Sequence, residues 1–427
     1  MKKKIKYLRE LLEYIPSGAQ TLSKNPSQYV IGVSPLAIRK AKGAYVWDID
    51  GHKYLDMILG LGPMIFGYAN EKIDEAVKKQ LDKGTIYSLP SEYELKLAKL
   101  LREVVPCAEM SRFVLSGNEA TSGAVRLARH ITGRDHVAKC GYHGCQDWSI
   151  CTKEGRNTGV PEIMKTMTHD FDYNDAESLE KIFKKYRGKI AAVILEPVSS
   201  ERPVNKFLQK VKQITKKHGA ILIFDEMVTG FRWALGGAQE YFGVIPDIAC
   251  FSKAVSNGYP VSIISGKAKY MKKMDEIFVS MTFAGFVPGL VAAIEVIKMM
   301  KRNPKVHEYM HKLGEHLIER GNMITGKYAL PFQFIGYGPH PVMKINIKDD
   351  YLNRLVKTFI YQEMNKAGIL FGTSLLIGYV HEKSEIDLVM DVFDSICRKI
   401  KEAGDFKNLE KSVEGEVVVP RTVRKIQ

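Results

Sequence analysis

A lysine, a carboxylate and a small-residue turn each stand at the end of an apolar segment. Lys253 follows "IACF" (248–251) in a stretch with few other charges, and Asp225 follows "ILIF". A lysine in such surroundings can form a Schiff base with an aldehyde. A carboxylate after an apolar strand needs a partner, such as the protonated nitrogen of a heteroaromatic ring. The turn "SGN" (116–118) opens a helical pattern, and a helix N-terminus suits a phosphate because its N–H groups are free.

Each of these three features has an ordinary alternative. Lys253 could be one more solvated cation, Asp225 could form a structural salt bridge or bind a metal, and many strand-to-helix turns contain Ser-Gly. Together, however, an aldehyde-binding amine, a carboxylate for a pyridine nitrogen and a phosphate cradle describe one cofactor, pyridoxal 5′-phosphate.

The elements that must position these residues alternate along the middle of the chain. Short apolar runs are separated by longer amphipathic stretches, which is typical of an α/β protein with a mostly parallel sheet flanked by helices. Ligands of such sheets bind at the carboxyl ends of the strands, where these polar residues stand. The expected strands are 112–115, 136–140, 190–195, 220–224 and 248–251.

Changes of pattern along the chain predict a large and a small domain. We expect an N-terminal segment (1–60) that joins the small domain, a large cofactor-binding domain (61–304) and the rest of the small domain, α+β, at 305–427. The segment 43–56 alternates apolar and polar residues around Asp-Gly, which predicts a hairpin. The polar stretch from about Asp405 is expected to be loosely held.

Composition excludes several classes of protein. The chain of 427 residues has a formal charge of +15, but its lysines are scattered and not interleaved with aromatic residues, so a solvated basic surface is favoured over a nucleic-acid site. No apolar run reaches the roughly 18 residues of a membrane span. The first fifteen residues have the apolar spacing of an amphipathic helix and lack the features of a signal peptide, which favours a cytoplasmic protein.

The six cysteines are too sparse for a disulfide scaffold and are expected to be reduced thiols. A zinc site could be suspected at Cys140, His143, Cys145 and Cys151, which lie close together in the sequence. They lack a CxxC pair, however, and Cys140 ends an apolar run as a strand residue would. We therefore expect no metal.

Several longer segments resemble class III, fold-type I pyridoxal-phosphate aminotransferases, and above all the glutamate-1-semialdehyde aminomutase branch. They are "SGNEATSGAVRLARHITGRD", "GYHG", "LIFDEMVTGFR", "GGAQEYFGVIPDIACFSKA" and "GAYVWDIDGHKYLD". The resemblance runs in the family's order from about Ile15 to Ile396. It implies a large domain with a mostly parallel sheet and a smaller domain built from both ends of the chain.

The resemblance implies the catalytic pair and the residues around the cofactor ring. Lys253 matches the lysine that binds the cofactor and serves as the base of the 1,3-proton shift, and Asp225 matches the partner of the ring nitrogen. Met227 and Tyr142 match the residues on the two faces of the ring. His143 adjoins Tyr142 and could equally be structural.

The phosphate end follows from the same match. Ser116, Gly117 and Asn118 occupy the phosphate turn, with Asn118 where the family often has threonine. Thr282 matches a threonine that reaches the phosphate from the partner subunit, which implies a homodimer with sites at the subunit interface. Glu196 matches a glutamate near the cofactor, without a defined role.

The chain departs from the aminomutase pattern where that family meets its substrate. Thr21 and Lys24 stand in place of a serine and an arginine, Leu61 in place of a tryptophan, and Glu201 lies in a segment that replaces "GNM". A lysine lacks the bidentate fork of arginine but remains suited to a phosphate.

These departures favour a different substrate with unchanged cofactor chemistry. We expect an aminotransferase that moves an amino group from an amino acid, such as glutamate, to a small aldehyde or ketone by a ping-pong Schiff-base mechanism, with a phosphorylated or sugar-linked acceptor as one option. The alternatives are a glutamate-1-semialdehyde 2,1-aminomutase and, in another class, a non-catalytic ligand- or nucleic-acid-binding protein of the same fold.

Overall fold

The computed structural model describes residues 2–198 and 200–419, and the chain forms two compact units. Unit 2 contains the middle of the chain, and unit 1 combines its two ends. Their bounds are Gly62–Met64 and Glu71–His307 for unit 2, and Met1–Leu61, Ile65–Asn70 and Glu308–Gln427 for unit 1.

Unit 2 contains a seven-stranded sheet of order β4-β10-β9-β8-β7-β5-β6. The strands β6, β5, β7, β8 and β9 are parallel, and β10 runs antiparallel to both of its neighbours. The strand bounds are β4 Met110–Val114, β5 His136–Cys140, β6 Thr168–Asp170, β7 Ile190–Leu195, β8 Ile221–Asp225, β9 Ile248–Phe251 and β10 Ser262–Gly266. The expected α/β architecture is therefore confirmed, although β6 and β10 were not among the expected strands.

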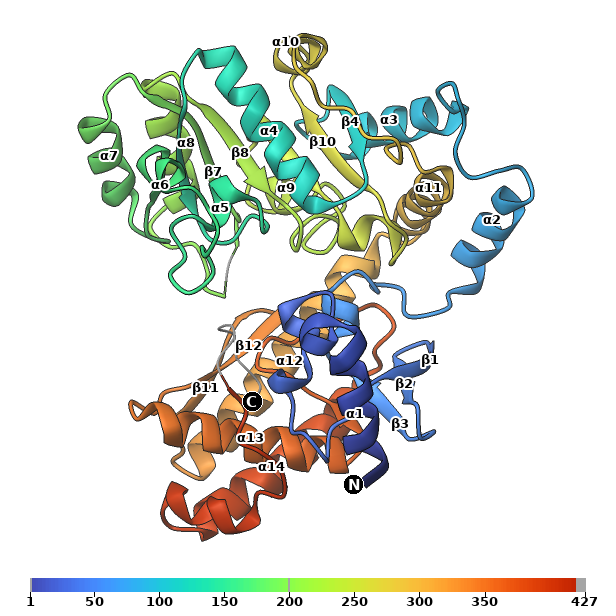
Figure 1. Ribbon diagram of the computed structural model, residues 1–427, viewed down its shortest axis with the longest axis vertical. Coiled ribbons are helices and arrows are strands. Elements are labelled where there is room, and N and C mark those ends of the chain that lie inside the picture. Colours follow the sequence, from blue (N-terminus) through green and yellow to red (C-terminus); the bar gives the residue numbers. More distant parts are fainter. Residues whose placement is uncertain (1, 199, 420–427) are drawn as a thin grey trace. The chain divides into compact units, whose positions relative to one another are not determined.

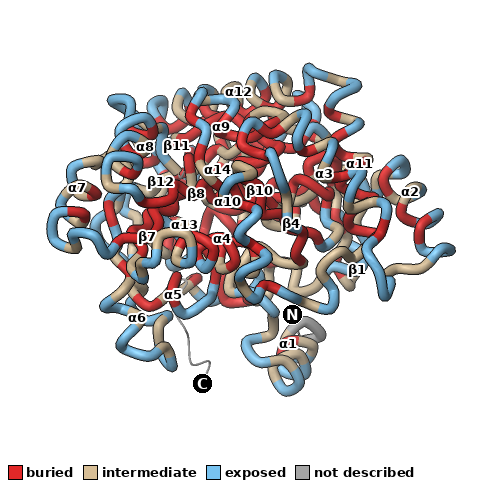
Figure 2. The backbone as a smooth tube through the Cα atoms, turned by 90° about the horizontal axis from the view of Figure 1, so that it is seen from above, coloured by how far each residue is buried: buried red, intermediate tan, exposed pale blue. Residues whose placement is uncertain are grey.

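Both faces of this sheet are covered. All six residues of β7 are buried, and because neighbouring residues of a strand point to opposite faces, each face packs against other elements. Helix α4 (Gly117–Thr132) packs across β7, β8, β9 and β10 (Figure 1). Its residues Ala124 and Leu127 belong to the apolar core. Figure 2 shows the sheet strands β7, β8 and β10 as buried.

The remaining helices of unit 2 follow the alternation that the sequence indicated. They are α2 Glu71–Leu81, α3 Glu92–Val104, α5 Asp147–Ile150, α6 Glu162–Met167, α7 Ala176–Lys185, α8 Phe207–Lys217, α9 Ala238–Tyr241, α10 Ala268–Met271 and α11 Val287–Arg302, with the 3-10 helices η5 Lys253–Ser256 and η6 Lys272–Glu276.

Helix α4 begins immediately after β4 because its first turn is capped. The Ser116 hydroxyl accepts the N–H of Glu119, and the Glu119 carboxylate accepts the N–H groups of Leu115 and Ser116. The helix ends at Gly133, whose left-handed φ of 63° a glycine adopts at low cost. Since β4 is parallel to β9, the start of α4 lies at the sheet edge where the parallel strands end.

Unit 1 contains a four-stranded sheet of order β1-β2-β3-β13 and a separate β11-β12 hairpin. The bounds are β1 Ile38–Lys42, β2 Tyr45–Asp48, β3 Lys53–Asp56, β11 Phe332–Tyr337, β12 His340–Ile345 and β13 Ile369–Leu370. The pairing of β2 with β3 matches the expected hairpin. The helices are α1 Lys2–Tyr14, η1 Pro16–Gly18, η2 Leu22–Lys24, η3 Pro26–Gln28, η4 Leu59–Leu61, α12 Lys305–Lys327, α13 Asp350–Lys366, α14 Lys383–Glu402 and η7 Phe406–Ser412, and the first three residues of α12 still belong to unit 2.

The stretch from Asp405 is not loosely held as far as it is described, so that expectation was wrong. Leu409 and Val418 are buried, at 2% and 3% exposed. The N–H of Val418 donates to the Thr358 hydroxyl of α13 at 2.9 Å, and Gln362 of α13 bonds the backbone of Ser412 and Glu414. Two apolar side chains and a run of backbone bonds fasten this polar segment.

All six cysteines are free thiols. Within residues 2–198 and 200–419, no helix combines the length and apolar character that a membrane crossing requires.

Candidate active site

Five strands of unit 2 deliver polar residues to one edge of the sheet. β4 leads to Ser116, β5 to Tyr142 and His143, and β8 ends at Asp225. The same edge receives Glu196 from β7 and Lys253 from β9, because these strands run in one direction. The fold therefore brings together residues that are up to 137 positions apart in the sequence, from Ser116 to Lys253.

The first turn of α4 is joined to the loop after β5. The Asn118 amide accepts the N–H of Cys145 at 3.1 Å and contacts its Sγ at 3.3 Å, while the Thr121 hydroxyl donates to the carbonyl of His143 at 2.8 Å. Gly144, at φ 113°, permits this approach, since a Cβ there would lie 2.1 Å from the Asn118 Oδ1 atom. These contacts hold the loop against the helix N-terminus.

His143 lies directly behind Asp225. Its Nδ1 atom is 2.8 Å from Oδ2 of Asp225, its Nε2 atom is 3.0 Å from the carbonyl oxygen of Cys140, and the side chain is fully buried. The ring stacks parallel to Trp148. His143 therefore orients the carboxylate, which is a role that the sequence could not separate from a merely structural one.

Asp225 is 3% exposed and has a second partner on its own loop. Its Oδ1 atom accepts the N–H of Met227 at 3.1 Å. Met227 in turn lies against Gly117, where a Cβ would approach its sulfur to 2.9 Å. The glycine at the start of α4 thus leaves room for the Met227 side chain beside the helix N-terminus.

Lys253 has a strained backbone and an altered acidity. Its φ of 50° is left-handed, which is uncommon for a residue with a side chain and marks functional sites in many proteins. Burial lowers the pKa of the Lys253 ammonium, while the charges of Glu196 and Asp225 oppose that shift. A larger share of the neutral amine is therefore present at neutral pH than for an exposed lysine, and the neutral amine is the nucleophile.

The pKa of Glu196 is shifted in the opposite direction from that of Lys253. Burial and then the charge of Asp225 raise the pKa of Glu196 to about 7, and His143 and Lys253 oppose this. Its Oε1 atom accepts the N–H of Tyr142 at 3.4 Å. The raised pKa favours the protonated carboxyl form of Glu196 within the group that contains Lys253.

One cavity of about 230 Å³ collects these side chains. The expected residues that line it are Gly117, Asn118, Tyr142, His143, Glu196, Asp225, Met227 and Lys253. Four further residues were missed, namely Thr121, Gly144, Val228 and Ser252. Thr121 stands one helical turn after Gly117, and Ser252 adjoins Lys253, so both spacings carried a usable signal.

Three expected residues of unit 2 lie outside this lining. The Ser116 hydroxyl caps α4. Thr282 is exposed in the segment before α11, and Glu201 is exposed in the loop after β7.

The remaining expected residues belong to unit 1. Lys24 and Leu61 line a second cavity of about 490 Å³. Thr21 is not part of its lining and is exposed immediately before η2. Lys24 is exposed, and its ammonium group makes no ion pair or hydrogen bond with any residue that the structure describes.

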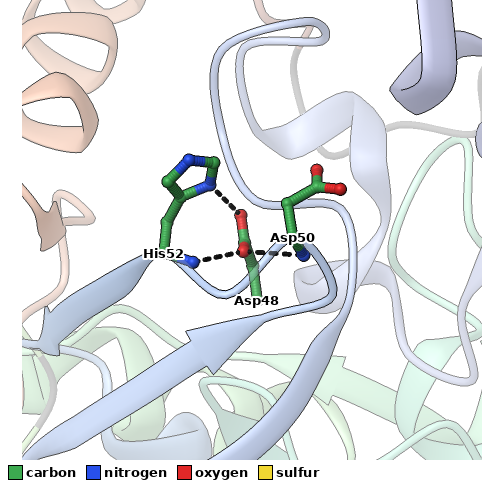
Figure 3. Close-up of side chains that lie close together, drawn as sticks. All are labelled: Asp48, Asp50 and His52. Carbon is green, nitrogen blue, oxygen red and sulfur yellow. Dashed lines mark hydrogen bonds and ion pairs between the residues drawn. The ribbon is translucent and has the colours of Figure 1, made fainter.

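Asp48, Asp50 and His52 lie close together in the β2–β3 turn and resemble a set of metal ligands (Figure 3). The Asp48 carboxylate, however, already accepts the N–H groups of Asp50 and His52, and contacts the His52 ring at 3.2 Å and the Tyr54 hydroxyl at 3.4 Å. The group therefore stabilises the turn of the hairpin.

Comparison with known proteins points in one direction. Residues 29–396 match the family model "Aminotransferase class-III". A glutamate-1-semialdehyde 2,1-aminomutase of Syntrophobacter fumaroxidans is 33% identical over 91% of this chain and 96% of its own length. A 3-aminobutyryl-CoA aminotransferase of Cloacimonas acidaminovorans is 33% identical over 83% of this chain and 86% of its own length.

Further aminomutases of the same name reach 40% identity over shorter stretches. Among solved structures, the PLP form of the FumI protein of Sphingopyxis sp. MTA144 superposes with a TM-score of 0.88 at 24% identity, over 98% of this chain and 99% of that one. The likeness to the FumI structure shows the fold alone.

Proposed function

The chain belongs to the class III aminotransferases, and on this basis we propose that it moves an amino group from an amino-acid donor to a separate small carbonyl acceptor. The enzyme class and its cofactor, pyridoxal 5′-phosphate, come with the family. The identity of donor and acceptor is the proposed part.

The residues that line the cavity of unit 2 fit this cofactor. The N–H groups at the start of α4 offer a site for its phosphate, and Met227 and Tyr142 offer surfaces for the two faces of the ring. Asp225, fixed by His143 and by the N–H of Met227, is suited to accept the hydrogen of a protonated ring nitrogen. The lysine amine lines the same cavity.

When bound, the cofactor supplies an electron sink for charge that develops at the substrate carbon. The chain's own residues do the rest. Lys253 would provide the amine that holds the cofactor covalently and, once released, would be the base that takes the proton from the amino-bearing carbon of the substrate. Asp225 would keep the ring nitrogen protonated, because a buried carboxylate favours a positive charge beside it.

Transfer between two molecules is supported by the residues that stand at the family's substrate positions. Lys24 replaces the arginine of the aminomutases and offers a point charge where they offer a bidentate fork. Leu61 replaces their tryptophan and lines, with Lys24, a cavity whose size suits a whole small ligand. Thr21 and Glu201 are further candidates for substrate contacts. An acceptor with a phosphate or carboxylate group fits Lys24.

The second candidate is glutamate-1-semialdehyde 2,1-aminomutase, in which the amino group moves within one substrate. The curated relatives favour it over the first candidate, because most of those compared carry that name. The presence of a 3-aminobutyryl-CoA aminotransferase at a similar identity keeps intermolecular transfer open within this range of divergence.

One experiment separates the two reactions. The purified holoenzyme is mixed with glutamate-1-semialdehyde in the absence of an amino donor, and separately with glutamate and a panel of keto and aldehyde acceptors. We expect glutamate-dependent amination of an acceptor and negligible 5-aminolevulinate. Rapid 5-aminolevulinate formation without a donor would overturn the first candidate in favour of the second.

We also propose a homodimer that acts in the cytoplasm. Two segments of unit 2, around Thr85 and around Val287, are joined by a backbone hydrogen bond of 3.0 Å. They expose large apolar side chains, which favours a protein interface. These are Leu89 (79% exposed), Phe278 (81%) and Phe283 (60%). Thr282 lies in the same region. Analytical ultracentrifugation should give a dimer, and Phe278→Asp should weaken it.

A further inference from the structure

Unit 1 contains a backbone turn that its sequence disfavours. Leu59, Gly60 and Leu61 all have left-handed φ angles, of 49°, 64° and 74°. A glycine adopts such an angle freely, but each leucine is strained there because its Cβ crowds the backbone. Two strained leucines in one three-residue turn persist only where the surroundings fix them.

The fixing group is the carboxylate of Asp56, the last residue of β3. Its Oδ1 atom accepts the N–H groups of Ile58 at 2.8 Å and Leu59 at 3.0 Å, and its Oδ2 atom accepts the hydroxyl of Tyr68 at 2.6 Å. Asp56 is 2% exposed, and its own N–H donates to the carbonyl of Ala44. A buried carboxylate on a rigid strand thus defines the path of the chain that follows.

This turn forms part of the wall of the second cavity. Asp56, Gly60, Leu61 and Tyr68 line it, and so does Lys24. Most of the other lining side chains are aliphatic, among them Pro26, Pro35, Leu36, Val46, Ile58 and Leu370. One free cation among aliphatic walls suits a small ligand with an apolar body and a single anionic group.

We propose that Asp56 and Tyr68 are positioning residues for this cavity, which hold Leu61 in the left-handed turn that sets the cavity's shape for an anionic ligand with an apolar body. The inference rests on the proposed function only in taking that ligand to be a substrate of the enzyme. Asp56 acts through the backbone of the turn, so its role differs from that of Lys24, which would meet the anion directly.

A series of variants of the full-length holoenzyme tests this role by binding. The probes are 3-phenylpropionate and phenyl phosphate, which share an apolar body and differ in the anion, and isothermal titration measures their affinity. Lys24→Ala and Asp56→Ala should each weaken the preferred probe by about 10-fold or more. Asp56→Asn keeps an oxygen acceptor for both N–H groups of the turn and should restore affinity to within about 3-fold of the wild type.

Thermal unfolding tests the same role without any ligand. Leu61→Gly removes the strain at that residue, so the loss of Tm caused by Asp56→Ala should be at least about halved in the Leu61→Gly background. Tyr68→Phe, which removes only one hydrogen bond, gives a milder variant in case Asp56→Ala does not fold.

Two results would overturn the inference. One is that Asp56→Ala binds both probes with wild-type affinity and that its loss of Tm and that of Leu61→Gly are additive in the double variant. Tyr68→Phe is used in the same way if Asp56→Ala does not fold. The other is a wild-type holoenzyme that binds neither probe at millimolar concentration. Borohydride reduction of the cofactor onto Lys253 is measured on the same samples, so a failure of the proposed function is seen separately.

Discussion

His143 and Asp225 form a buried pair, with 2.8 Å between Nδ1 and Oδ2, and the other ring nitrogen of His143 lies 3.0 Å from a carbonyl oxygen. The carboxylate therefore has one fixed orientation at the end of β8. Because Lys253 and Glu196 share its cavity, the position of Asp225 affects the whole group.

Asp225→Asn should still bind the cofactor but transfer amino groups about 100-fold more slowly or worse, because the amide does not keep a ring nitrogen protonated. Stopped-flow absorbance after the addition of an amino donor measures the half-reaction. Turnover near that of the wild type would contradict the role of Asp225.

Replacement of His143 should act through Asp225. His143→Leu leaves the carboxylate without its buried partner and should weaken cofactor binding by about 10-fold or more, since an unpaired buried charge is costly. His143→Gln keeps a side-chain N–H donor and should lie between the leucine variant and the wild type. Equilibrium dialysis of the cofactor measures both, and equal affinities in the two variants would argue against an orienting role.

Lys253→Ala should lose the borohydride-fixed linkage to the cofactor, as measured by mass spectrometry of the peptides. Lys139 provides the control, because it is another buried lysine of unit 2 whose pKa burial lowers, but it pairs with Asp170 at 2.5 Å. Lys139→Met should keep the linkage. A linkage that survives in Lys253→Ala would show that another amine holds the cofactor.

Glu196 should make the apoprotein less stable as the pH rises. Its pKa is about 7 in the folded protein against an ordinary 4.5, so between these values the unfolded chain binds fewer protons. The free energy of unfolding therefore falls from about pH 4.5 to about pH 7, by up to about 3 kcal/mol. Urea unfolding at several pH values should show a smaller slope in Glu196→Gln, whereas the exposed control Glu177→Gln should keep the wild-type slope.

Gly144 and Gly133 both have a left-handed backbone, but only at Gly144 would an added methyl group also clash with a neighbouring side chain. Gly144→Ala places a methyl group 2.1 Å from the Asn118 Oδ1 atom and should weaken cofactor binding by about 10-fold or more, because the loop is forced away from α4. Gly133→Ala has open space around the new methyl group and should cost only about 1 kcal/mol of stability. Equal cofactor affinity in both variants would exclude a role for the loop contact.

The sheet could be predicted because its signal is local. β5, β7 and β9 coincide with the expected apolar runs, since buried parallel strands are apolar on both faces. The strands β6 and β10 were missed because their sequences, "THD" and "SIISG", contain few apolar residues. The docking of Val418 onto α13 was missed because it depends on two apolar residues in a polar segment.

The candidate site was predictable residue by residue but not in its contacts. Lys253 and Asp225 could be chosen from their positions after apolar runs. The bond between His143 and Asp225 could not, because it joins residues 82 positions apart across the end of β7. The left-handed backbone of Lys253 was hidden as well, since no glycine or asparagine marks that position.

The division of the chain into two units has a consequence for how such an enzyme can diversify. Every residue that lines the candidate cofactor cavity lies between Gly117 and Lys253 in the sequence. Lys24, Asp56 and Leu61, which line the second cavity, all precede this stretch. Recombination at a single point in the gene, upstream of the codon for Gly117, would replace the N-terminal residues that line the second cavity. The recombinant enzyme would keep Lys253 and the residues around it unchanged. New selectivity could then arise in evolution, or in a laboratory library, without a fresh origin of the chemistry.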